Sequence, residues 1–222
     1  MSMTFDPYAS QNSLVDDKRA GHEDVLMTNP TALAELEAYW SALPRPRGLP
    51  KRTDLDPASL GALLENAFVL ERIAPGVARI RVAGRGIGVL LGVEPRGLPL
   101  TAAFLPASRG AMANYVEVAF SGPNIVELPL EGPRALGQPR LQGRINILPL
   151  LDDFGRVSRA VGMLVMSGRK GLGGRRFVIS DIEPPRIAPV GQLRVVTGER
   201  MTDHVMKKAE DRPALRLVVS NN

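Results

Sequence analysis

The chain of 222 residues contains no cysteine. This absence excludes a disulfide framework, metal sites built on thiolates, a cysteine nucleophile and photochemistry that forms a cysteinyl adduct. Histidine occurs only twice, as His22 and His204, close to the two ends of the chain. The central part of the chain therefore offers neither the base of a hydrolytic triad nor the histidine ligand of a haem iron.

Long apolar runs are also missing. No run reaches the length of a membrane-spanning helix, and the polar start, residues 1–24, lacks the apolar core of a signal peptide. The hydrophobic fraction of 44% is nevertheless enough for the core of one domain with extensions. We therefore expect a soluble, cytoplasmic protein without a membrane partner.

The net charge of +5 is unevenly distributed along the chain. Residues 1–43 carry two basic and seven acidic side chains, whereas residues 131–176 carry nine basic and three acidic side chains. The basic region would attract an acidic partner or nucleic acid through long-range steering. A solvated, arginine-rich surface explains the same charges and is the more common arrangement. A nucleic-acid-associated regulator that uses residues 131–176 is therefore the weaker alternative.

The strongest local pattern lies in residues 66–91. Residues 68–73 and 77–82 alternate between two faces, which is the period of strands in a sheet with one face covered. Pro75 and Gly76 supply the turn of a hairpin, because proline presets φ and glycine tolerates positive φ. The alternation divides the second strand into Val77, Arg79 and Arg81 on one face and Ala78, Ile80 and Val82 on the other.

A glycine-rich corner follows the hairpin, where Gly84, Gly86 and Gly88 are similar to a dinucleotide-binding fingerprint. The sixth position of that fingerprint requires glycine, but Val89 stands there, and no acidic residue follows about twenty positions later. The hairpin is also antiparallel, whereas a dinucleotide fold needs a parallel crossover. We therefore interpret the corner as a tight strand-to-helix turn.

Residues 31–43 predict an amphipathic helix after a polar, acidic start that we expect to be flexible, residues 1–30. The apolar positions follow at spacings of three, four and three, which place them on one face of the helix. Such a stripe must pack on the domain or on a partner, so this is a candidate interaction helix. The stripe consists of Leu33, Leu36, Trp40 and Leu43.

Two aspartates precede the next predicted helix, which runs to about Leu64. Asp56 is placed as its N-cap with Pro57 at the first helical position, and the charge of Asp54 is favourable near that helix terminus. The two carboxylates could also form a catalytic pair or a cation site. We favour capping, because the proline explains their position and no third ligand is nearby.

The second half predicts a longer helix over residues 107–120 and three antiparallel strands over residues 125–130, 144–151 and 157–166. Asp152 and Asp153 open the turn between the last two strands, and we expect both to be solvated.

The region after these strands is basic and rich in glycine over residues 168–176. It is not a phosphate loop, because neither Ser nor Thr follows Lys170, and it predicts a mobile surface loop. Residues 177–180 are expected to edge the sheet. Residues 181–222 are expected to form a partly disordered C-terminal tail.

This order of elements resembles a PAS domain, and residues 36–180 are similar to a PAS-like family common in alphaproteobacteria. The similarity rests on residues 39–43 (YWSAL), 50–57 (PKRTDLDP), 63–68 (LLENAF), 79–84 (RIRVAG), 91–92 (LG), 96–97 (RG), 147–150 (ILPL), 152–155 (DDFG) and 175–177 (RRF).

The resemblance implies an α+β fold with a five-stranded antiparallel sheet and helices packed on one face, plus the leading helix and the C-terminal tail. The domain would span residues 31–180. The resemblance also implies a sensory or regulatory module and a homodimer, but no catalytic or cofactor-binding residues carry over from it, and the cofactor is unknown.

A ligand-responsive regulator is the first functional hypothesis. A small molecule would lie between the sheet and the helices in a mostly apolar pocket, with Arg81 and Tyr115 as polar contacts. Close packing of the same positions is the ordinary alternative. The candidate lining residues are Phe68, Ile80, Arg81, Val82, Leu90, Leu91, Phe104, Tyr115, Val126, Leu128, Ile147 and Met163.

The second hypothesis is a protein-interaction module without a ligand, which would use the helix of residues 31–43 to dimerise or to bind a signalling partner. An enzyme is the least expected class, because the sequence contains no kinase, cyclase or hydrolase motif.

Overall fold

The computed structural model describes residues 25–26 and 31–192. The remaining parts of the two predicted terminal segments, residues 1–24, 27–30 and 193–222, lie outside the described residues.

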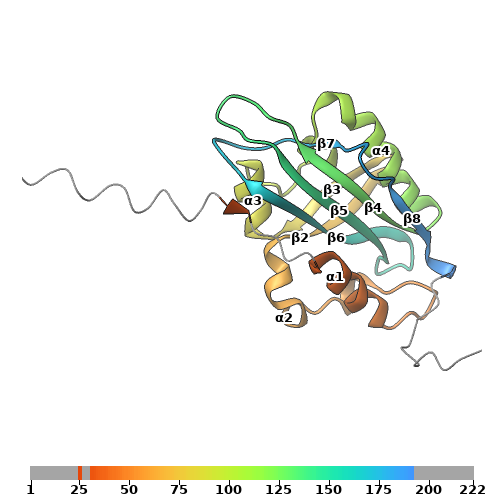
Figure 1. The fold of residues 1–222 in the computed structure, drawn as a ribbon. Helices are drawn as coiled ribbons and strands as arrows, with labels where there is room; N and C mark the ends of the chain where they lie inside the picture. The colour runs from red at the N-terminus through yellow and green to blue at the C-terminus, as the bar shows by residue number, and fades with distance from the viewer. Residues whose placement is uncertain (1–24, 27–30, 193–222) are drawn as a thin grey trace, which may run out of the picture.

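Five strands form the central antiparallel sheet, in the order β3-β2-β6-β5-β4 (Figure 1). The hairpin predicted from residues 66–91 is present, and the three strands of the second half form the predicted meander. The five-stranded sheet inferred from the sequence is therefore confirmed. Its strands are β2 (Ala67–Ala74), β3 (Val77–Ala83), β4 (Asn124–Gly132), β5 (Leu141–Leu151) and β6 (Val157–Arg169).

Within the described part of the chain, three short strands extend this sheet. β1 (Val25–Leu26) pairs with the end of β6, while β7 (Val178–Ile179) and β8 (Arg186–Pro189) both pair with β4. A 3-10 turn, η4 (Val190–Gln192), follows β8, and the buried Val190 donates its N–H to Pro123. The domain therefore continues past the end predicted at residue 180. Four residues behind a proline pair are too few to show the alternation of a strand.

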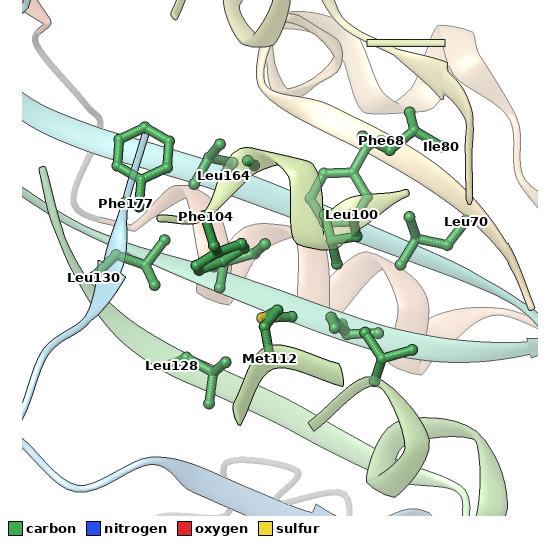
Figure 2. Close-up of a cluster of buried hydrophobic side chains, with 14 of the residues drawn as sticks. Phe68, Leu70, Ile80, Leu100, Phe104, Met112, Leu128, Leu130, Leu164 and Phe177 are labelled. Atoms are coloured by element: carbon green, nitrogen blue, oxygen red, sulfur yellow. The ribbon is translucent and has the colours of Figure 1, made fainter. Parts of the chain in front are cut away.

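One face of the sheet is covered by α3 (Arg85–Leu91), η3 (Leu100–Ala103) and α4 (Pro106–Ser121). These helices and the sheet enclose the larger hydrophobic core. Figure 2 shows the rings of Phe104 and Phe177 among side chains that come from several strands and helices. Phe177 also binds the backbone between η3 and α4, because its N–H donates to Ala103 and its carbonyl accepts from Leu105.

The opposite face is covered by the leading segments of the chain. These are α1 (Ala32–Ala42), η1 (Arg52–Asp54), α2 (Pro57–Leu60) and η2 (Gly61–Glu65). Leu33, Leu36 and Trp40 of α1 are buried in a second core against β5 and β6. The indole Nε1 of Trp40 donates to the carbonyl of Pro149 at 3.0 Å. The stripe proposed as an interaction helix thus packs on the chain's own sheet, and Leu43 at its end is half-buried.

The predicted helix cap at Asp56 and the predicted tight turn at Gly84 are both present. Asp56 caps α2, because its carboxylate accepts from the N–H groups of Ala58 and Ser59. Gly84 lies against the carbonyls of η2, where a Cβ would come within 1.9 Å of the carbonyl oxygen of Leu64. Gly84 and Gly86 therefore allow close packing between η2 and the start of α3.

A β-bulge changes the second strand of the hairpin from its predicted alternation. Val69 pairs with Val82 across the ladder, and the next residue of β2, Leu70, pairs with Ile80. Arg81 is therefore an extra residue in β3. After the bulge, Val82 lies on the same face as Val69, and it is 61% exposed. The prediction that Val82 shares the inward face of Ile80 is therefore wrong.

The basic loop of residues 168–176 is anchored in this structure, which corrects the expectation of a mobile loop. Arg175 is 1% exposed, and its guanidinium donates to the carbonyls of Lys170, Gly132, Pro133 and Pro139 at 2.8 to 3.2 Å. A buried guanidinium needs such acceptors, since an unsatisfied buried charge is costly. The side chain thus joins the β4–β5 loop to the segment that follows β6.

Replacing Leu36 with alanine is expected to lower the free energy of unfolding by about 2–5 kcal/mol, because this fully buried side chain would leave a cavity under α1. Urea denaturation measures the change. Val89→Ala, at a half-exposed position on α3, is the control and should change the value by less than about 0.5 kcal/mol. An unchanged unfolding free energy for Leu36→Ala, with loss of a dimer, would instead place the stripe in a partner interface.

Candidate functional site

Most of the residues predicted to line a ligand pocket belong to the larger core. They are side chains that pack together between the sheet and α3, η3 and α4, and each is at most 4% exposed. Internal cavities would add to that exposure, so these side chains fill the predicted pocket space themselves. Tyr115 is half-buried and packs against the same cluster. The core members are Phe68, Ile80, Leu90, Leu91, Phe104, Val126, Leu128 and Ile147.

The other three predicted residues lie on the opposite face of the sheet. Met163 belongs to the second core under α1, because it points to the face opposite Leu164. Arg81 and Val82 are exposed on the outer surface of β3. The twelve predicted residues therefore do not form one pocket.

A groove of about 700 Å³ lies on this opposite face. Its floor comes from β2, β3 and β6, and its wall comes from η1, α2 and η2. Its size falls within the usual range of small-molecule sites. Arg81 and Val82 line it, and Phe68 also borders it, although Phe68 belongs to the larger core on the other face.

The apolar surface of the groove comes from both floor and wall. Alternation on β2 and β6 places Ala67, Val69 and Val161 in the floor. The wall is apolar because α2 turns the side chain of Leu60 toward the sheet. The remaining apolar wall residues are Leu55, Pro57 and Leu64.

Three charged side chains from three adjacent strands meet in the floor. Glu71 of β2 forms ion pairs with Arg81 of β3 and Arg159 of β6. The register explains the second pair, because Glu71 lies directly opposite Arg159 across the β2–β6 ladder. Burial raises the pKa of the Glu71 carboxyl, but hydrogen bonds and charges from Arg159 and Arg81 outweigh burial and hold the pKa below its ordinary value.

This arrangement suits binding better than proton transfer. A carboxylate held ionised by two guanidiniums is a weak general base and is not available as a general acid. Among the described residues, His, Cys, Asp and Glu also form no group of three that could hold a metal ion.

One end of the groove is formed by the β5–β6 turn, which contributes Asp153. The preceding Asp152 is 5% exposed, so the prediction that it is solvated is wrong. Its carboxylate accepts from the N–H groups of Phe154 and Arg156, from Nε of Arg156 and from the hydroxyl of Ser158. Burial raises the pKa of the Asp152 carboxyl, but these hydrogen bonds outweigh it and hold the pKa well below its ordinary range.

Sequence reasoning missed the groove because of the bulge in β3. Strict alternation puts Arg81 and Val82 on opposite faces, whereas the bulge puts both at the groove. The usable signal was the charge pattern, since Glu71 shares the outward face of its strand with Val69 and has oppositely charged neighbours on both adjacent strands.

A family model described as PAS domain (PAS_5) matches residues 27–165, which is more than half of the chain. The chain belongs to the PAS domain family. The strand order of the sheet and the match agree on the α+β fold inferred from the sequence. No curated protein matches the chain.

Two solved structures similar to this PAS domain are those of the blue-light photoreceptor Aureochrome1 LOV, in the light state and in the dark state. Each is 18% identical in sequence. The light-state match covers 50% of this chain and 88% of that chain with a TM-score of 0.36. The dark-state match covers 51% and 86% with a TM-score of 0.37.

Asp152→Asn is expected to lower the free energy of unfolding by about 1–3 kcal/mol at pH 7, because an uncharged amide cannot accept the same set of hydrogen bonds. The folded-state pKa is depressed, so the stability from Asp152 is present above its unfolded pKa and is lost as pH falls. Urea denaturation between pH 7 and about pH 3 measures this. The difference in unfolding free energy between wild type and Asp152→Asn should become smaller below about pH 4. The control Asp153→Asn, at an exposed position, should leave the unfolding free energy unchanged. If the difference between wild type and Asp152→Asn stays constant down to about pH 3, ionised Asp152 is not the source of the stability.

Proposed function

We propose that this PAS domain protein is a non-enzymatic sensory or regulatory protein of the cytoplasm, and that its signal is a small molecule bound in the groove over β2, β3 and β6. The groove itself is the observation that carries the proposal. It combines a volume of about 700 Å³, mostly apolar walls and a small cluster of charged groups. That combination is typical of small-molecule sites.

The inner face of the sheet, which α3, η3 and α4 cover, is suited to a structural role and not to ligand binding. Side chains such as Phe104, Val126 and Leu128 have no exposed surface and complete a continuous core. A ligand there would have to displace packed side chains, at a cost comparable to creating a cavity of its own size. The inner face is therefore proposed as the structural core.

A protein-interaction module without a ligand is the second candidate. The exposed apolar side chains of Leu64 and Val82 at the groove favour it, because a second copy or a signalling partner could cover them. The helix of residues 31–43 is less suited to this role, since its stripe already covers the sheet.

A nucleic-acid role for residues 131–176 receives little support from the contacts of its basic side chains. Arg140, Arg144 and Arg156 each pair with a carboxylate, while Arg175 and Arg176 donate to main-chain carbonyls. Side chains held in this way are poorly placed to neutralise phosphates.

Replacing Val82 with tryptophan is expected to fill the groove and to remove bound ligand without unfolding the protein, because Val82 is exposed. Native mass spectrometry of the purified full-length protein, compared with its denatured mass, measures this directly. Wild type should show excess mass that denaturation releases, and Val82→Trp should show none.

The matched control is Val89→Trp, which changes the same residue type at a position 47% exposed on α3, the helix that covers the other face. It should keep the excess mass. A wild-type dimer without excess mass, which Val82→Trp converts to a monomer, would favour the interaction-module alternative. Excess mass that both variants keep would place the ligand elsewhere.

A further inference from the structure

We propose that the groove takes an amphipathic molecule with one carboxylate, such as a medium-chain fatty acid, whose carboxylate binds Arg81 and Arg159 and whose apolar part lies along the floor and wall. This inference rests on the proposed function, since it names the chemical class of the small molecule bound there.

The two floor arginines have more donors than their carboxylate partner can use. Each guanidinium carries five N–H donors. Arg81 directs Nε and Nη2 at one oxygen of Glu71, and Arg159 forms an ion pair with the other oxygen through Nη1. The side chains of Arg81 and Arg159 remain 49% and 24% exposed at the groove. The planar, bidentate geometry of the remaining donors matches a carboxylate.

The charge balance of the groove favours a single negative charge. Among the described residues, its lining contains three arginines and two carboxylates, because Arg52 and Asp153 join Glu71, Arg81 and Arg159. The excess of one positive charge is neutralised by one carboxylate. The excess positive charge would repel a cationic ligand. A dianion would leave one negative charge uncompensated in a partly enclosed site.

The apolar part of the molecule has a continuous surface to cover. Val82, on the floor, and Leu64, on the wall, expose apolar surface to solvent although the groove is bordered by charges. Covering such apolar surface favours binding. A purely ionic ligand would leave it exposed, and a purely apolar ligand would desolvate the guanidiniums without replacing their hydrogen bonds. Both requirements together define an amphipathic carboxylate.

The test compares decanoate with decan-1-ol, which has the same chain but no charge. Each is titrated into the full-length protein, with affinity from calorimetry and location from amide NMR shifts. Decanoate is expected to bind roughly tenfold or more tightly than decan-1-ol, which corresponds to one charge-assisted contact. The largest amide shifts should fall on Val69, Val82 and Val161.

The variant Arg81→Gln removes one guanidinium and leaves Glu71 paired with Arg159, so the fold is retained. It should weaken decanoate roughly tenfold and change decan-1-ol by less than about twofold. The matched control is Arg79→Gln on the same strand, because Arg79 donates to the carbonyl of Gly97 and does not line the groove. It should leave both affinities unchanged.

The outcomes separate this inference from the proposed function. If both probes bind in the groove with equal affinity, or if Arg81→Gln leaves decanoate unaffected, the groove binds ligands but the carboxylate inference is overturned. If neither probe shifts the groove amides, the inference is also overturned, and the native mass experiment then decides whether another ligand occupies the groove. Shifts confined to α3 or α4 would contradict both proposals.

Discussion

The pairing of β5 with β6 is the constraint on which the rest of the fold depends. The two strands are paired from Gln142 and Ser167 to Leu151 and Val157, at the middle of the sheet, and their apolar residues face both sides. A sheet that is apolar on both faces must be covered on both faces. The helices after β3 cover one side, so the leading segments, α1 above all, have to cover the other. The carbonyl of Pro149 makes this second contact specific, because it accepts the indole N–H of Trp40.

The groove exists because α1 and α2, the two helices on the outer face of the sheet, differ in length. α1 has 11 residues and covers the sheet around β5 and β6, whereas α2 has 4 residues and continues into a 3-10 turn beside β2 and β3. A short helix cannot cover a three-strand surface, and the floor near β3 is therefore open to solvent. The charged trio of Glu71, Arg81 and Arg159 occupies this open part, where side chains remain partly hydrated and ion pairs are tolerated at little cost.

The sequence predicted the fold better than the site, and the reason is physical. Periodicity and capping residues act locally, so the hairpin, the meander and the cap at Asp56 could be read directly. The bulge at Arg81 could not, because an extra residue leaves the pattern of residue types unchanged while it inverts the face of every following residue. Burial of Arg175 and Asp152 was missed for a related reason. Their partners are carbonyls, N–H groups and hydroxyls supplied by the folded loops, which composition does not reveal.

The position of Glu71 gives the proposed site a mechanical connection to the sheet. Its carboxylate holds the edge strand β3 to β2 through Arg81 and β2 to the central β6 through Arg159. A ligand carboxylate that binds the remaining donors of the same guanidiniums becomes a second partner of Arg81 and Arg159 beside Glu71, and so changes the charge balance between these strands. The inner core is close-packed, so it resists deformation and would pass a displacement of these strands on to the helices that cover them. The outer face is therefore the surface on which we propose that the ligand binds.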